Sequence, residues 1–265
     1  NVLAGLGEQL GVAARGGQLF VAVAHALEWA LVGHELLREG HGGGHDVACW
    51  DLVKRDRSYT PAKPTLDGEP NYEDHPVNPW PKWNPDNGYY RDYDVRKQTY
   101  RSVFAGACGV TYGHHAVWQF MSEREETINY PDRGWVNAMD RPGAFQVGYL
   151  RKLIMSRPML QRVPDNSIIT QGQGEKGEHM EAFHAADNSY AMIYLPLGKT
   201  ITVNTANITG KIIAWWFNPK NAEAYQINIA EKTNSTEFTS PTTGTGNDWV
   251  LVIDDASKGY KVPGK

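Results

Sequence analysis

The sequence predicts an α/β region followed by an antiparallel β-sandwich. Between residues 40 and 164, helical and strand-like patterns alternate and long polar loops separate them, which is typical of an α/β fold. Between residues 165 and 265, short strand-like runs follow one another at regular spacing, with Gly, Asn or Pro in the turns, as in a sandwich. A length of 265 residues suits one large domain or two of moderate size.

Residues 1–39 fit neither pattern, because they are rich in Ala, Gly and Leu and show a poor apolar stripe. The most apolar stretch, residues 19–32, is interrupted by His25 and Glu28, so we expect no membrane span. The chain starts at Asn1 without the basic start and small-residue cleavage site of a signal peptide, and we expect a fragment or a processed product.

Four elements are predicted in the α/β region. Pro64 and Pro70 bias the residues before them toward extended backbone, so a short strand is expected to end abruptly near Glu69. The other three are a helix over residues 93–108 that begins after Asp92 or Asp94, a strand over residues 109–115 that runs into a loop, and a helix over residues 143–156.

Six strand-like runs are predicted in the all-β region, each bounded by turn residues. They cover residues 181–184, 190–195, 200–204, 211–217, 225–229 and 249–253. No internal repeat is visible, so the runs are read as strands of one sandwich.

Composition and motifs exclude several function classes. With 21% charged residues, a formal net charge of -4 and no basic stripe, the chain does not resemble a nucleic-acid-binding protein. It has no phosphate-binding glycine loop and no G-x-G-x-x-G motif, so no nucleotide or other cofactor is expected. The run from His41 to Gly44 mimics the oxyanion loop of lipases, but no G-x-S-x-G turn accompanies it.

Cys49 and Cys108 stand among small and apolar residues and are expected to be buried free thiols.

Two clusters of chemically active side chains are expected to converge. Glu69, with Tyr72 and Glu73 beside it, follows the first strand, while the second strand leads into a cluster that begins at Tyr112. In a strand–helix–strand unit both strands end at the same face, so these side chains are predicted to line one pocket. A carboxylate, aromatic faces and imidazole donors suit a sugar site. The second cluster consists of Tyr112, His114, His115 and Trp118.

Structural alternatives stand beside each of these assignments. Glu69 also fits an exposed loop glutamate, and Tyr112 and Trp118 also fit a barrel core with surface histidines next to them. No metal site is expected, because the spacing of His41 and His45 lacks the pattern of a zinc site. Adjacent histidines on a strand would also point to opposite faces.

Four motifs carry a resemblance to a known family. They are Leu-Asp-Gly-Glu-Pro-x-Tyr-Glu at residues 66–73, Tyr-Asp-Val-Arg at 93–96, Ser-Val-Phe-Ala-Gly-Ala-Cys-Gly at 102–109 and Tyr-Gly-His-His-x-x-Trp at 112–118. Together they resemble the apiosidase-like glycoside hydrolases, of the kind of glycoside hydrolase family 140, over residues 40–164. Residues 165–265 resemble the sandwich known as the collagen-binding domain of a collagenase. No residue in that region itself points to collagen as a ligand.

The resemblance implies a (β/α)8 barrel that hydrolyses plant cell-wall or related polysaccharides with two catalytic carboxylates. It places Glu69 at the end of the seventh strand as nucleophile or base. The substrate-binding candidates are then His41, Tyr72, Tyr112, His114, His115 and Trp118. The same resemblance suggests a periplasmic or extracellular protein, although no signal for export is seen.

The resemblance begins only near the sixth strand, so the partner acid is expected outside this chain, and the chain alone is expected to be inactive. Because the likeness starts sharply near residue 40, we hypothesise that residues 1–39 come from an out-of-frame translation or a gene-model artefact. The alternative function is a non-catalytic carbohydrate-binding or cell-surface adhesion module.

Overall fold

The computed structural model describes residues 44–265 except residues 78–83, 125 and 230–232. All of these residues belong to one compact unit, Glu35–Lys265. The anomalous segment at residues 1–39 and the candidate His41 lie outside the described residues.

The α/β region contains a parallel strand pair joined by a long helix. Strand β1 pairs with β2, with Leu66 opposite Gly109 and Asp67 opposite Val110, and α5 connects them. The helix expected at residues 93–108 begins at Asp92, where the Asp94 carboxylate accepts a hydrogen bond of 2.9 Å from the Arg91 N–H. The elements are α4 (Cys49–Arg57), β1 (Leu66–Asp67), α5 (Asp92–Phe104), β2 (Gly109–Val110), α6 (His115–Trp118), α7 (Trp135–Ala138) and α8 (Pro142–Met155).

The strand predicted over residues 109–115 is wrong after its first two residues. Strand β2 ends at Val110, and His114 instead caps the short helix α6. The Nδ1 atom of His114 accepts a hydrogen bond of 3.0 Å from the Ala116 N–H, which satisfies a donor of the first helical turn. The two histidines therefore belong to a helix start and not to alternating strand faces.

The β region consists of two antiparallel sheets, of six and three strands. The six-stranded sheet has the order β3-β5-β6-β11-β8-β9, and the three-stranded sheet has the order β10-β7-β4. The strands are β3 (Arg162–Pro164), β4 (Ile169–Gln171), β5 (Glu181–Ala185), β6 (Tyr190–Leu195), β7 (Thr200–Asn204), β8 (Ile212–Phe217), β9 (Ala224–Ile227), β10 (Ser235–Thr239) and β11 (Trp249–Asp255).

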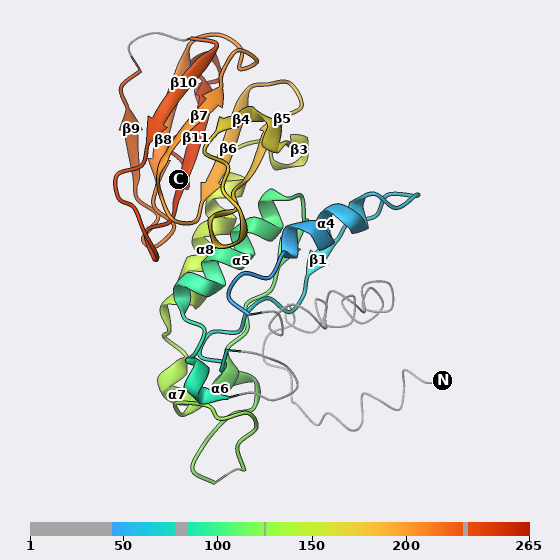
Figure 1. Cartoon of the computed structure of the whole chain (residues 1–265), viewed down its shortest axis with the longest axis vertical. Helices are drawn as coiled ribbons and strands as arrows, with labels where there is room; N and C mark the ends of the chain where they lie inside the picture. Colours follow the sequence, from blue (N-terminus) through green and yellow to red (C-terminus); the bar gives the residue numbers. More distant parts are fainter. Residues whose placement is uncertain (1–43, 78–83, 125, 230–232) are drawn as a thin grey trace. The chain divides into compact units, whose positions relative to one another are not determined.

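Two hydrophobic cores cover the two faces of the six-stranded sheet. On one face Ile193 and Leu251 pack in a cluster that also contains Phe238 of the three-stranded sheet. On the other face lies a cluster that joins the sheet to α5 and α8, which run side by side there (Figure 1). This cluster includes Phe183, Met192 and Tyr194 of the sheet and Tyr100, Phe104 and Leu153 of the two helices. All residues of β6 and β11 are consequently buried.

Charged groups also cross from the α/β region to the sheet. Arg96 of α5 is buried and forms an ion pair with buried Asp248, with Nη2 and Oδ1 separated by 3.0 Å. Its Nη1 donates to the side-chain oxygen of Gln146 at 2.6 Å, and the Tyr194 hydroxyl donates to Asp248 at 3.2 Å. These partners satisfy two charges that would otherwise be costly to bury.

The cysteines differ from each other. Cys49 is buried in α4 as expected, but the expectation for Cys108 is wrong, because this residue lies exposed between α5 and β2; both thiols are free. Within the described ranges, no helix has the length and apolar character needed to cross a membrane.

Candidate active site

The turn that carries Glu69 is held in place from the neighbouring strand. After β1 ends at Asp67, the backbone carbonyl of Asp67 accepts a hydrogen bond of 3.1 Å from the Thr111 N–H. The Thr111 hydroxyl donates to the carbonyl of Gly68 at 2.6 Å. Glu69 follows as a half-buried residue. Its carboxylate is thus attached to an ordered turn beyond the carboxyl end of a parallel strand pair.

Tyr72 lies close enough to the candidate carboxylate for Glu69 to influence its pKa. Burial, the charge of Glu69 and a hydrogen bond to Glu69 together raise the pKa of Tyr72 to about 12. The phenol therefore stays protonated at neutral pH and remains a hydrogen-bond donor next to Glu69. The ring lies against Gly113, where a Cβ atom would come within 2.3 Å of two ring carbons.

Glu73 is fully buried and binds the ends of two other elements. Its Oε2 atom accepts hydrogen bonds from the Tyr112 hydroxyl at 2.7 Å and from the N–H of Gly143, in the first turn of α8, at 3.0 Å. Burial raises the pKa of the Glu73 carboxyl, although these two hydrogen bonds act in the opposite direction. Tyr112 is therefore directed at Glu73 and not at Glu69.

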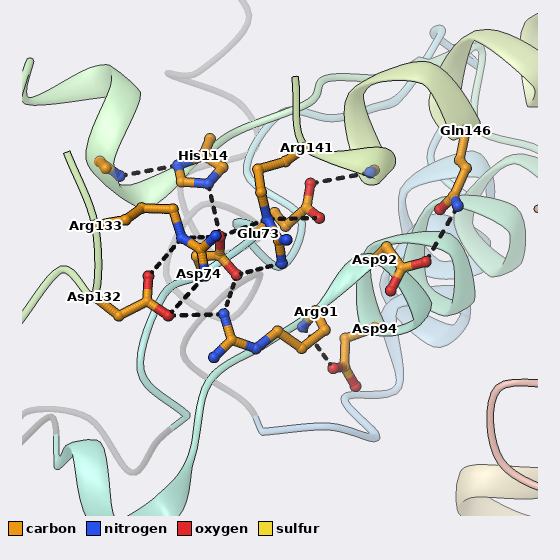
Figure 2. A network of polar contacts seen from close by, with 12 residues as sticks. Glu73, Asp74, Arg91, Asp92, Asp94, His114, Asp132, Arg133, Arg141 and Gln146 are labelled. Carbon is orange, nitrogen blue, oxygen red and sulfur yellow. Dashed lines mark hydrogen bonds and ion pairs between the residues drawn. The ribbon is translucent and has the colours of Figure 1, made fainter. Parts of the chain in front are cut away.

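Asp74 is the centre of a charged network that Figure 2 shows from close by. The carboxylate forms ion pairs with Arg91, with Arg133 at 2.8 Å from Nε, and with Arg141 at 3.0 Å from Nη2. The fourth partner is His114, whose Nε2 lies 3.0 Å from Oδ2. Burial alone would raise the pKa of Asp74, but the hydrogen bonds from His114, Arg91 and Arg141 hold it well below its usual range.

Both predicted histidines are buried, and their ring nitrogens contact the protein itself. His114 contacts Asp74 through Nε2 and the Ala116 N–H through Nδ1. His115 has its Nε2 at 2.8 Å from the carbonyl of Asn129, and its Nδ1 accepts from the indole N–H of Trp118 at 3.3 Å. This geometry gives the two imidazoles partners within the protein, and the alternative that placed them on the surface is wrong.

Trp118 differs from the histidines because half of its side chain is exposed. Other large apolar side chains are exposed on the same segment and on α7. They are Phe120, Ile128, Tyr130 and Val136. The segment therefore presents large apolar side chains to solvent, and three of them, Trp118, Phe120 and Tyr130, are aromatic.

Comparison with known families decides the identity of the region that contains Glu69. Residues 25–161, more than half of the chain, match the family described as apiosidase-like, catalytic domain. The chain belongs to the apiosidase-like family. The match begins at residue 25, inside residues 1–39, whose composition differs from that of the rest of the chain. Residues 163–254 match the family described as "Putative collagen-binding domain of a collagenase".

Solved structures similar to this apiosidase-like chain are glycoside hydrolases. One, described as a glycoside hydrolase, is 33% identical with a TM-score of 0.73, over 78% of this chain and 46% of that one. Another, a glycoside hydrolase family 5 protein from Bacteroides vulgatus ATCC 8482, is 32% identical with a TM-score of 0.75, over 80% and 46%. The chain thus spans about half the length of these two structures. A comparison with curated proteins finds no match.

In this apiosidase-like chain, sequence reasoning did not find the charged network around Asp74. Arg91, Arg133 and Arg141 are far apart in the sequence and form no local motif. The one signal was Asp74 itself, an acidic residue directly after a motif that already contains two glutamates. In the ranges that the structure describes, no group of three or more His, Cys, Asp or Glu side chains is placed to hold a metal ion.

Proposed function

We propose that the whole protein is a glycosidase that acts on plant cell-wall or related polysaccharides, with Glu69 as its nucleophile or base. The observation that carries this proposal is the placement of Glu69 on a turn just beyond β1 that the Thr111 hydroxyl holds through the Gly68 carbonyl. That turn lies inside the stretch that matches the apiosidase-like catalytic domain. A carboxylate at the carboxyl end of a parallel strand is where barrel enzymes place catalytic groups.

The proposed architecture is the C-terminal part of a (β/α)8 barrel over residues 40–164, followed by a β-sandwich over residues 165–265. The parallel unit β1-α5-β2 supports the first part, because such units build a barrel. Two antiparallel sheets with a shared hydrophobic cluster support the second. Since the chain spans about half of the similar structures, the reaction is proposed for the whole protein.

In the proposed mechanism Glu69 supplies one of two carboxyl groups. As nucleophile it attacks the anomeric carbon, and as base it takes a proton from the attacking water, while a carboxylic acid on an earlier strand protonates the leaving oxygen. Tyr72 donates a hydrogen bond that orients Glu69. The exposed face of Trp118 offers a stacking surface for a sugar ring.

The test is release of sugar from plant pectic oligosaccharides by the full-length protein and its Glu69→Gln variant. Glutamine keeps the size of the side chain but can neither attack nor accept a proton, so kcat should fall by about 10²–10⁴-fold. Exposed Glu126, changed to Gln in the same way, is the matched control and should leave kcat unchanged.

Equal release by the wild-type and Glu69→Gln proteins would dismiss Glu69 as catalytic. Binding of the oligosaccharides by the wild-type protein without any release would favour the alternative, a non-catalytic carbohydrate-binding module. Multiple turnovers by the 265-residue chain alone would contradict the assignment of the partner acid to an earlier strand.

A further inference from the structure

We propose that a cavity at the amino ends of β1 and β2 binds the carboxylate or phosphate group of a small organic molecule. The cavity has a volume of about 310 Å³, at the lower end of the range for small-molecule sites. Three cations, Arg57, Lys63 and Arg162, line it together with the thiol of Cys108. Because the Glu69 turn follows the other end of β1, this inference goes beyond the proposed function.

The positive charge of the cavity is not neutralised by a carboxylate. None of the lining residues is acidic. Across the part of the chain that the structure describes, Arg57, Lys63 and Arg162 form no ion pair. Burial and the nearby charge of Arg57 lower the pKa of Arg162, because the two guanidinium groups repel each other. An anion in the cavity would offset this repulsion.

Backbone carbonyls at the end of α5 hold both guanidinium groups in place. Arg57 donates from Nη1 to the carbonyl of Gly106 at 2.9 Å, and a Cβ atom at Gly106 would lie 2.6 Å from that nitrogen. Arg162 donates from Nη1 to the carbonyl of Val103 at 3.0 Å and from Nη2 to that of Ala107 at 3.3 Å. A helix C-terminus carries only about half a negative charge, so these carbonyls orient the arginines without neutralising them.

Apolar side chains form much of the remaining wall and indicate the class of ligand. Pro64, Met159 and Leu160 line the cavity, and Leu160 is 93% exposed. A large apolar side chain that stands in water gains free energy when an apolar body covers it. Guanidinium groups match the oxygens of carboxylates and phosphates. The ligand is therefore expected to combine one such anionic group with an apolar body.

The first experiment uses exposed Cys108 as a reporter inside the cavity. It compares how fast Cys108 of the full-length protein reacts with an aromatic disulfide that carries carboxylates and with dipyridyl disulfide, which is neutral. Cys108→Ser gives the background. Lys63→Gln should lower the ratio of the two rates about fivefold, because a charge that attracts the anionic reagent is lost.

Lys220→Gln, at an exposed lysine outside the cavity, is the matched control and should keep the wild-type ratio. No reaction at Cys108, or an unchanged ratio in Lys63→Gln, would overturn the proposal.

The second experiment measures Tm and the protection of Cys108 from dipyridyl disulfide with benzoate, benzamide or inorganic phosphate present. Benzoate should protect the thiol and raise Tm, whereas benzamide, which has the same shape without the charge, should do neither. Phosphate should protect at higher concentrations than benzoate, because it lacks an apolar body. In Lys63→Gln the benzoate concentration for half protection should rise about fivefold.

No protection by benzoate, or equal protection by benzamide, would overturn the proposal. Equal protection by phosphate and benzoate would overturn the assignment of an organic ligand. Neither experiment involves sugar release, so a failure of the proposed function would leave both results intact.

Discussion

Gly113 packs directly against the ring of Tyr72. The ring of Tyr72 occupies the position that any side chain at residue 113 would need. The backbone φ angle of Gly113 is not in the left-handed region, so the requirement is for space and not for conformation. The absence of a side chain at this one position lets Tyr72 reach Glu69.

Gly113→Ala should therefore destabilise the protein. The new methyl group would lie 2.3 Å from the Tyr72 ring, and overpacking of this kind costs about 1–3 kcal/mol in the free energy of unfolding. Gly148→Ala in α8 is the control, because its methyl group would meet nothing within 4 Å and alanine favours a helix by about 1 kcal/mol. Urea unfolding of the two variants checks the prediction, and equal midpoints would contradict it.

Asp67 gives the protein a pH-dependent stability. Its pKa is about 6 in the fold and 3.8 for the ordinary side chain, so the folded state binds the proton more tightly. Stability should rise as the pH falls from above 6 toward 4, and Asp67→Asn should lack this part of the dependence. Between pH 7 and pH 4 the wild type should gain roughly 2–3 kcal/mol relative to the variant. The measurement is the free energy of unfolding of both proteins at the two pH values. An equal difference between them at pH 7 and at pH 4 would contradict this prediction.

At the scale of the elements, Asp74 joins the beginnings of four helices. Arg91 precedes α5, His114 caps α6, Arg133 stands just before α7 and Arg141 precedes α8. Positive side chains at helix N-termini are unfavourable next to the helix dipole. The buried carboxylate of Asp74 offsets that repulsion and brings the four helix starts to one point (Figure 2).

Asp74→Asn should loosen this arrangement without disturbing the backbone. Asn tolerates the φ of 58° found at this position, but it removes the charge that faces three arginines. Because the arginines are partly exposed, we expect a loss of roughly 2–4 kcal/mol, somewhat less than for a fully buried pair. Hydrogen exchange over residues 114–141 should increase. The control is Asp132→Asn, which has a more exposed carboxylate and should change little.

The Asp74 contribution should also disappear in acid. The pKa of Asp74 is held well below its usual range, so its stabilisation is complete above the ordinary pKa of about 4. As the pH falls below 4, the unfolded chain takes up this proton first and the stabilisation is progressively lost. Wild type and Asp74→Asn should therefore converge in stability below pH 4, and a constant difference down to pH 2 would contradict this account.

Local sequence signals predicted helices and strands better than they predicted side-chain contacts. The runs at residues 190–195 and 200–204 were found at their observed bounds, and the helix at 143–156 was displaced by one residue at each end, because period and flanking turn residues mark such elements. Strand β10 was missed, since Ser235–Thr239 has only one fully buried residue. Of the candidate site, the roles of Glu69 and Tyr72 stay predictions, whereas His114 and His115 turn inward toward partners that no spacing in the sequence indicates.

At the scale of the whole described unit, the six-stranded sheet and the α/β region share one core. Eleven of the thirteen residues of α5 are buried, including Arg96, Lys97 and Arg101. The Arg101 guanidinium donates to the carbonyls of Lys176, Gly177 and His179, in the segment before β5. Such a shared core argues that the C-terminal sheets stabilise the α/β region and are more than an attached module.

The two regions should consequently unfold together. Arg96→Met leaves Asp248 buried without its ion-pair partner and should cost roughly 3–5 kcal/mol. In the double variant with Asp248→Asn, part of that loss should be recovered, because no unpaired charge remains. Chemical denaturation followed by tryptophan fluorescence and by circular dichroism should give one midpoint for each protein. Two separated transitions would show that the regions are independent.

The position of β11 has a consequence for the order in which the protein is made. Residues 249–255 come last among the strands in the sequence, yet β11 lies between β6 and β8 in the middle of the sheet. During synthesis, β6 and β8 cannot complete the six-stranded sheet until this segment has been made. Until then the apolar face of α5 and α8 has no complete cover. During synthesis, the apolar surface of these elements therefore stays exposed until the last strand of the sheet is added.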